Sequence, residues 1–454
     1  MAEFFSQYVP TWLAYLLAAL VHCVLLIHVV AVGALGFIWL ERKVAGRIQD
    51  RLGPTRVGGK FGWLQTLADG LKLITKEDLM PEGADAVLFR LAPYISFCAS
   101  FCAYIALPFS DGWVAVELNA GVFFILAVMG LEVFGVILAG YSSASKWSLF
   151  GGMREAAQVV SYEVPMGMCV VVPVLIAGTM DLVQIGRLQE GLFTNWLIFH
   201  DPFTFITFWV YFTCATASVN RAPFDLAEAE SELVAGFHTE YSGLRWSFFF
   251  MAEYGSMFAV SGLAAILFFG GWNGPLPISE WLTLTHAHGP VWGYLGNFLG
   301  MLNFILKCVA GVTFMMWARW TLPRLRIDQV MKVCLKYCTP IAAVMFLGAV
   351  VWTFYLPEGV TGGRRPYAEK LYRPATGQAS EQSRLSLSES SDRRLSLRES
   401  PRARATQVQG NFRGAKVDNA LVSGSPLPGH RQGSAPATGA ALEHSAFRTP
   451  HSNQ

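Results

Sequence analysis

Three glutamates stand inside long apolar stretches of the sequence, where an ionised side chain is costly. Glu132, Glu163 and Glu253 are the residues concerned. A charge at the centre of a bilayer costs roughly 3 kcal/mol or more, so such carboxyls neutralise, pair, or face a polar interior. A desolvated carboxyl can also take up and release a proton near neutral pH. Three of them, without a matching supply of cations in the same stretches, favour a proton route over isolated hydrogen bonds between helices.

A second group of carboxylates lies in residues 220–241. This segment holds one Arg, Arg221, and five carboxylates within 16 residues: Asp225, Glu228, Glu230, Glu232 and Glu240. The alternative is a solvated acidic loop, but Phe224, Leu226 and Leu233 make the segment too apolar for that. Crowded carboxylates repel and titrate as a coupled set. Such a set can respond to a change of charge on a bound ligand.

Residues 41–77 are rich in basic residues, among them Arg42 and Arg51, and include an amphipathic stretch. Apolar residues at spacings of three and four predict a helix over 63–76 that lies in the membrane interface. Asp69 and Lys72, three residues apart on it, are expected to face each other. A basic juxtamembrane anchor is the simpler interpretation, although an anchor does not need acidic residues.

The elements that position these residues are predicted to be membrane helices. Of the 454 residues, 53% are hydrophobic and only 15% are charged, against about a quarter charged in soluble domains. This excludes a soluble domain, and the net charge of +2 argues against a nucleic-acid partner. Continuously apolar stretches of about 20 residues predict about eight membrane-spanning helices in an all-α polytopic protein. We place them near 13–40, 88–108, 119–140, 158–178, 196–218, 246–270, 296–318 and 337–356.

The placement of basic residues supports eight spans. Four alternate loops, with the span ends beside them, hold 18 of the 20 Lys and Arg of residues 1–358. The remaining two are Arg187 on the opposite side and Lys307 inside the seventh span. By the positive-inside rule the basic loops face the cytoplasm and both termini lie outside. The first span lacks signal-peptide features and is read as retained. Asp201-Pro202 is a candidate start of the fifth helix.

Two further predictions concern the cysteines and the C-terminal residues. The eight cysteines contain no CxxC or CxxH spacing, so no metal site is predicted. Residues 359–454 are rich in Ser, Arg, Gly and Pro, which predicts a disordered low-complexity tail after a membrane domain of residues 1–358.

Several short motifs, taken together and in order, resemble a known family. They are Glu41-Arg42-Lys43, Arg51-Leu52-Gly53-Pro54, Ala68-Asp69-Gly70-Leu71-Lys72, Ser161-Tyr162-Glu163-Val164, Arg221-Ala222-Pro223-Phe224-Asp225, Glu228-Ala229-Glu230-Ser231-Glu232-Leu233, Glu240-Tyr241 and Ala252-Glu253-Tyr254. Over roughly residues 10–358 the sequence resembles the NuoH family, the H subunits of proton-translocating NADH:quinone oxidoreductase (respiratory complex I).

The resemblance implies a role for each site residue. It implies that the chain forms part of the quinone-binding chamber and couples quinone reduction to proton translocation. The residues that would line or shape the chamber are Arg42, Arg51, Asp69, Lys72, Arg221 and Asp225. Those that would couple protons are Glu132, Glu163, Glu228, Glu230, Glu232 and Glu253.

The resemblance also implies cofactors, partners and location. The chain would bind no cofactor, take quinone as substrate, and rely on FMN and iron–sulfur clusters in partner subunits. Those partners would be hydrophilic subunits B, C, D and I and membrane subunits A, J, K, L, M and N, in a bacterial inner membrane with both termini periplasmic. One departure stands out: some members carry a Glu three residues before the Arg of Arg-x-Pro-Phe-Asp, where this sequence has Ser218.

Two alternatives remain at this point. One is the homologous membrane subunit of a membrane-bound hydrogenase or related dehydrogenase. The completeness of the region from Glu41 to Lys72 favours a quinone enzyme. The other is a standalone proton-coupled transporter, which would usually show inverted repeats and broken helices; the sequence has no convincing repeat.

Overall fold

A computed structural model describes residues 10–276 and 290–356, all within one unit of the chain, Met1–Pro374. The described part is built of helices and contains no strand, only one isolated bridge between Ser110 and Trp113. Three 3-10 turns connect the helices: η1 (Phe193–Asn195), η2 (Leu197–Phe199) and η3 (Gly236–His238). The helices are α2 (Thr11–Ile48), α3 (Gln65–Thr75), α4 (Ala86–Ala106), α5 (Gly121–Ser142), α6 (Lys146–Ala177), α7 (Leu182–Leu188), α8 (Pro202–Ser218), α9 (Glu230–Leu233), α10 (Gly243–Phe268), α12 (Pro290–Thr321), α13 (Ile327–Met331), the π-helix η5 (Lys332–Cys338) and α14 (Thr339–Tyr355).

Seven of the described helical segments are long and apolar enough to cross a membrane: α2, α4, α5, α6, α10, α12 and the continuous run α13–η5–α14. The remaining predicted span, the fifth, at 196–218, corresponds to α8, whose 17 residues are at the short end of the range for a bilayer-spanning helix, about 17–25. The predicted all-α polytopic membrane class is therefore confirmed. The interfacial helix predicted at 63–76 is present as α3, and the predicted tail, 359–454, lies outside the described residues.

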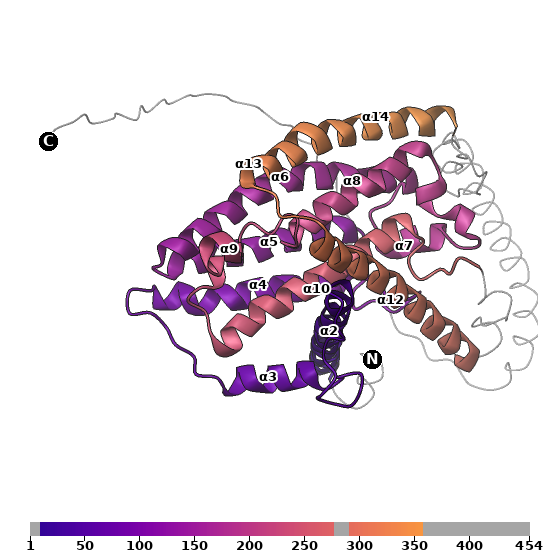
Figure 1. Ribbon diagram of the computed structural model, residues 1–454. Coiled ribbons are helices and arrows are strands. Elements are labelled where there is room, and N and C mark those ends of the chain that lie inside the picture. The colour runs from indigo at the N-terminus through magenta and orange to yellow at the C-terminus, as the bar shows by residue number, and fades with distance from the viewer. Residues whose placement is uncertain (1–9, 277–289, 357–454) are drawn as a thin grey trace, which may run out of the picture. The chain divides into compact units, whose positions relative to one another are not determined.

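Helix α10 is the centre of the described bundle and contacts α2, α4, α8 and α12 (Figure 1). Of its most apolar stretch 83% is buried, against 6% for α2, so α2 presents most of its apolar surface outward. Small residues bring the neighbours of α10 close. A Cβ added at Gly255 would lie 2.6 Å from Ser100 Oγ of α4. This is the close packing typical of membrane helices, where small residues let backbones approach.

Helix α6 begins at Lys146, well before the predicted start of the fourth span at 158. Its first turns are not apolar throughout, so a search for continuous hydrophobicity passes over them. They are nevertheless buried along one face, at Ser148, Gly151, Glu155 and Gln158. Residues at spacings of three and four share a helix face, and this face packs against η3. The extension brings Glu155, which the predicted spans place in a loop, into the interior.

Two polar residues of the fold cap helix ends. Asp201 is the N-cap of α8, accepting hydrogen bonds from Thr204 N and Thr204 Oγ1 at 2.6 and 2.9 Å, with Pro202 in the first turn. This agrees with the start proposed for the fifth helix. Lys307, inside α12, donates to the carbonyl oxygens of Phe269, Gly271 and Asn273 at 2.6, 2.9 and 2.5 Å. A cation there complements the C-terminal end of α10.

Candidate functional site

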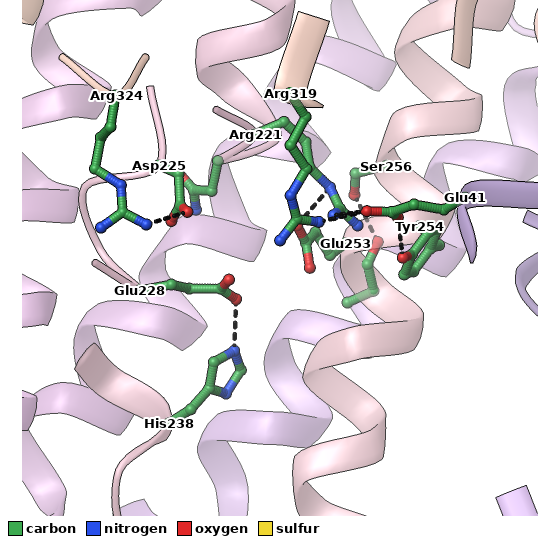
Figure 2. Close-up of polar contacts among 12 residues, drawn as sticks. Glu41, Arg221, Asp225, Glu228, His238, Glu253, Tyr254, Ser256, Arg319 and Arg324 are labelled. Carbon is green, nitrogen blue, oxygen red and sulfur yellow. Dashed lines mark hydrogen bonds and ion pairs between the residues drawn. The ribbon is translucent and has the colours of Figure 1, made fainter. Parts of the chain in front are cut away.

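A buried arginine lies at the centre of the polar residues in the described part of the chain. Arg221, on the loop after α8, is 2% exposed. Its Nε lies 2.8 Å from Glu253 Oε1 of α10, and its Nη1 donates to Glu41 Oε1 of α2 at 3.4 Å. Its guanidinium carbon lies 4.6 Å from the centre of the Tyr254 ring. Figure 2 shows the guanidinium between these carboxylates, an arrangement that compensates the charge of each.

Glu41 joins three helices through its buried carboxylate. Besides Arg221, Arg319 Nη1 near the end of α12 donates to Glu41 Oε1 at 2.7 Å. The hydroxyl of Tyr254 on α10 donates to the other oxygen, Oε2. The ends of α2 and α12 and the middle of α10 therefore meet at one carboxylate, as Figure 2 shows. We name Glu41, Arg221, Glu253, Tyr254 and Arg319 the Arg221 cluster.

Two further pairs extend from this cluster along the loop between α8 and α10 (Figure 2). Arg324 Nη2 lies 2.9 Å from Asp225 Oδ2, and His238 Nε2 lies 2.8 Å from Glu228 Oε1. Burial and the nearby charge of Glu228 raise the pKa of Asp225 to about 6. The charge and hydrogen bond of Arg324 act in the opposite direction but do not outweigh them. Burial also acts to raise the pKa of Glu228, but the hydrogen bond and charge of His238, with Arg221, outweigh it and the pKa is lowered. Neighbouring carboxyls thus differ in how readily they hold a proton.

The loop between α8 and α10 does not hold the set of unpaired, mutually repelling carboxylates that its sequence indicated. Glu232, exposed on α9, pairs with Arg154 Nη1 of α6 at 2.7 Å. Asp225, Glu228 and Glu253 have the partners described above. Of the three glutamates in the apolar stretches, Glu253 is given a cation by Arg221, which reaches inward from the loop after α8. Arg319 and Arg324 pair instead with Glu41 and Asp225. The side chain of Glu230 lies outside what the structure describes.

A small polar cavity lies between α5, α6, α10 and the loop. Its volume is about 20 Å³, enough for a water molecule. On its α5 side, Glu132 accepts a hydrogen bond from Ser256 Oγ of α10. We call it the carboxylate cavity after its acidic lining residues, Glu132, Glu155, Glu228 and Glu253.

Two larger hollows adjoin the Arg221 cluster. A pocket of about 440 Å³, the polar pocket, is lined by Glu41, Arg42, Arg51, Glu228, His238, Tyr254 and Arg319 among others. A groove of about 680 Å³, the apolar groove, lies between α2, α10 and α12 and is lined almost wholly by apolar side chains. Tyr254 lines both this groove and the polar pocket. Glu228 and His238 line both the polar pocket and the carboxylate cavity, so the two hollows share a wall.

Comparison with known proteins assigns the family. A family model described as NADH dehydrogenase matches residues 21–350. The chain is 46% identical over 323 residues to the H subunit of NADH-quinone oxidoreductase from Chlorobium luteolum, covering 70% of this chain and 85% of the relative. The chain belongs to the H-subunit family of NADH-quinone oxidoreductase. The H subunit from Anaeromyxobacter dehalogenans is 44% identical over 320 residues (69% of this chain, 77% of the relative), and that of Geobacillus kaustophilus 43% over 357 residues (78% and 100%).

Membership of the H-subunit family agrees with the predicted resemblance. A chain of this family is a subunit of an oxidoreductase complex, and the apolar helices make it a multi-pass membrane protein. This excludes the standalone transporter.

The structure brings some of the predicted site residues together and leaves others apart. Arg42 and Arg51 line the polar pocket, and Arg221 and Asp225 lie in the buried pairs beside it. Lys72 is exposed and is not among the pocket-lining residues. Glu163 is also exposed, with its Oε1 3.4 Å from the position that a Cβ on Gly130 of α5 would take.

One predicted contact was wrong. Asp69 forms its ion pair with Arg42 of α2, and its side chain also accepts from Gln65 at 3.3 Å; it does not pair with Lys72. Both partners of the Asp69–Arg42 pair are partly exposed. The spacing of three residues allowed a pair within α3, but α3 packs against α2 and a longer-range cation takes its place.

Several members of the site were absent from the predicted set. Arg319 and Arg324 were read only as topology signals, and His238 was not considered. Glu41 stood in a matching motif without a role, and its sequence position at the end of an apolar span was the available signal. Glu155 had a clearer signal, since it continues the three-and-four spacing of Ser148, Gly151 and Gln158.

Proposed function

We propose that this chain forms the membrane part of the quinone-binding chamber of NADH:quinone oxidoreductase and couples quinone reduction to proton translocation through its buried glutamates. The observation that carries the proposal is that the polar pocket shares lining residues with both the apolar groove and the carboxylate cavity, beside the Arg221 cluster. A substrate with a polar head and a long apolar tail fits the first two, and a proton-exchanging set of carboxyls fits the third.

The polar pocket offers hydrogen-bond donors suited to a quinone head. The two ring carbonyls accept hydrogen bonds, and Arg42, Arg51 and His238 line the pocket with side chains able to donate. The apolar groove, which shares Tyr254 with the polar pocket, has a volume of about 680 Å³ and an apolar lining suited to an isoprenoid tail. Asp69 would act through Arg42, whose guanidinium it holds, and Lys72 would lie on the interfacial helix at the approach to the pocket.

Reduction of a quinone consumes two electrons and two protons, so charge changes in the pocket while the reaction proceeds. In this proposal Glu228 and His238 respond first, because they form the wall shared with the carboxylate cavity. Asp225, Glu230 and Glu232 belong to the same loop. Low local dielectric strengthens the effect of such a charge on neighbouring carboxyls.

The membrane glutamates then form the onward route. Glu253 pairs with Arg221, and Glu132 lies at the far side of the carboxylate cavity. Glu163 lies on the exposed face of α6, beside α5. An exposed carboxyl within a membrane-spanning helix is costly against lipid, which supports a contact between this face and a neighbouring membrane subunit of the complex.

The rest of the assembly follows from this role. Electrons would reach quinone from FMN and iron–sulfur clusters in partner subunits, with no cofactor held by this chain. The partners proposed are hydrophilic subunits B, C, D and I and membrane subunits A, J, K, L, M and N. The basic loops would face the cytoplasm and the termini the periplasm of a bacterial inner membrane.

The test is Glu132→Gln in the complete complex, measured in sealed inverted membrane vesicles. Glutamine keeps the shape but cannot exchange a proton, so we expect both proton pumping and quinone reductase activity to fall at least about tenfold. The matched control is Glu117→Gln, an exposed carboxyl in the loop between α4 and α5, which should pump normally. Normal pumping by an assembled Glu132→Gln complex would refute the coupling role.

A further inference from the structure

Glu155 is a fully buried carboxyl that none of the roles above uses. It lies in the first half of α6, is 0% exposed, and lines the carboxylate cavity. Neither oxygen accepts a hydrogen bond of acceptable geometry from any described residue, although the Asn220 side chain interacts with it from the loop after α8. A buried carboxyl whose polar neighbour is a neutral amide, with no cation paired to it in the described residues, carries a charge only at high cost. The burial of Glu155 is therefore not explained by an ion pair that stabilises the fold.

The surroundings of Glu155 are acidic on several sides. The titratable groups of the elements packed around it are Glu132 on α5, Tyr162 on α6, Asp225 and Glu228 on the loop, His238 on η3, and Glu253 on α10. Of these, Glu228 and His238 also line the polar pocket. His238 Nδ1 is, like the oxygens of Glu155, buried without a hydrogen bond to a described residue. Glu155 therefore lies in the carboxylate cavity with Glu132, and Glu228 and His238 separate it from the polar pocket.

We propose that Glu155 is a proton-relay residue, carrying protons through the carboxylate cavity between the Glu228–His238 pair at the polar pocket and Glu132 in the membrane. This rests on the proposed function and adds a step to it. The cavity, about 20 Å³, has room for a water molecule, which can bridge carboxyls that are not in direct contact. In each transfer the carboxyl O–H of Glu155 breaks as an O–H bond forms on the acceptor, and a proton from the other side restores it.

Ser218 lines the same cavity from the end of α8. A glutamate placed at 218 would enter the same hollow as Glu155. The two positions are therefore expected to be interchangeable as sources of a relay carboxyl, and this exchange gives the proposal its most specific test.

The experiment uses the complete complex in sealed inverted membrane vesicles, with four variants: Glu155→Gln, Glu155→Asp, the double variant Glu155→Gln/Ser218→Glu, and the control Glu117→Gln. Assembly, quinone reductase activity and proton pumping are measured for each. We expect Glu155→Gln to assemble normally and to lose pumping at least about tenfold. Glu155→Asp should retain part of it, and the double variant should recover most of it.

The outcomes separate this inference from the proposed function. Normal pumping by Glu155→Gln, with pumping lost in Glu132→Gln, overturns the relay role of Glu155 alone. Normal pumping by both overturns the proposed function. Failure of Glu155→Gln to assemble also overturns the inference, because glutamine preserves shape and a relay carboxyl is not needed for folding. Failure of the double variant to recover, when it assembles, shows that the two positions do not serve one route and overturns it as well.

Discussion

The guanidinium of Arg221 lies 2.8 Å from the carboxylate of Glu253. This pair fastens the loop between α8 and α10 to the central helix α10, inside the part of the chain that excludes solvent. The loop is therefore held by an ion pair as well as by its buried apolar residues, and Glu228 lies beside the polar pocket.

Replacing Arg221 by Met should strongly destabilise the chain, because it leaves Glu41 and Glu253 short of a buried cation. Removing one partner of a buried pair costs about 3–5 kcal/mol. We expect less assembled complex and a lower thermal midpoint, measured after mild detergent extraction. The double variant Arg221→Met/Glu253→Gln should be less affected than the sum of the single changes. Wild-type stability in Arg221→Met would contradict the central place given to this pair.

Arg42→Ala should raise the apparent KM for quinone while leaving assembly largely intact. Arg42 lines the polar pocket, but its pair with Asp69 is partly exposed, and exposed pairs contribute only about 0–1 kcal/mol. The measurement is steady-state reductase kinetics against quinone concentration. Arg187→Ala is the matched control, since it breaks another exposed pair, with Asp111, away from the pocket. An unchanged KM in Arg42→Ala would count against the pocket as the quinone site.

Lys307→Met should lower stability without a direct effect on quinone affinity. The ammonium group satisfies three backbone carbonyls at the end of α10, and hydrogen bonds to charged groups contribute about 1.5–3 kcal/mol each. Thermal unfolding of the extracted complex measures the loss. Lys336→Met, at an exposed lysine of η5, should unfold like the wild type. Equal midpoints for the two variants would show that Lys307 is not a cap.

The raised pKa of Asp225 predicts a pH dependence. In an unfolded chain this carboxyl ionises near its ordinary value of 3.8, and in the folded chain near about 6. The folded chain therefore binds more protons between these values, so stability should fall as pH rises through this interval and become constant above it. Thermal midpoints of the extracted complex across this range, for the wild type and for Asp225→Asn, measure it. The substitution should remove this contribution to the slope; an identical slope in both proteins would reject it.

Glu163→Gln should lower both quinone reductase activity and proton pumping if this exposed carboxyl continues the route into a neighbouring subunit. The loss of a titratable group interrupts proton transfer but leaves the packing of α6 against α5 in place. Sealed vesicles carrying the variant complex provide the measurement. Unaltered pumping would remove Glu163 from the route and would leave the roles of Glu132 and Glu253 to be judged separately.

Hydropathy and charge placement were enough to predict the all-α membrane class, the interfacial helix and the position of most spans. They were not enough to predict ion pairs, because these join residues far apart in the sequence. Arg319 and Glu41 are 278 residues apart, and no local pattern links them. Glu155 was missed for a different reason. A hydropathy window ends where polar residues begin, whereas α6 extends several turns further toward its N-terminus with one buried face.

The distance in sequence between Glu41 and Arg319 also bears on how the chain is made. At a synthesis rate of about 5–20 residues per second, a separation of 278 residues corresponds to an interval on the order of tens of seconds. During that interval Glu41 has been synthesised and Arg319, which pairs with it, has not. The Arg221 cluster can therefore be completed only after α12, which carries Arg319, has been synthesised.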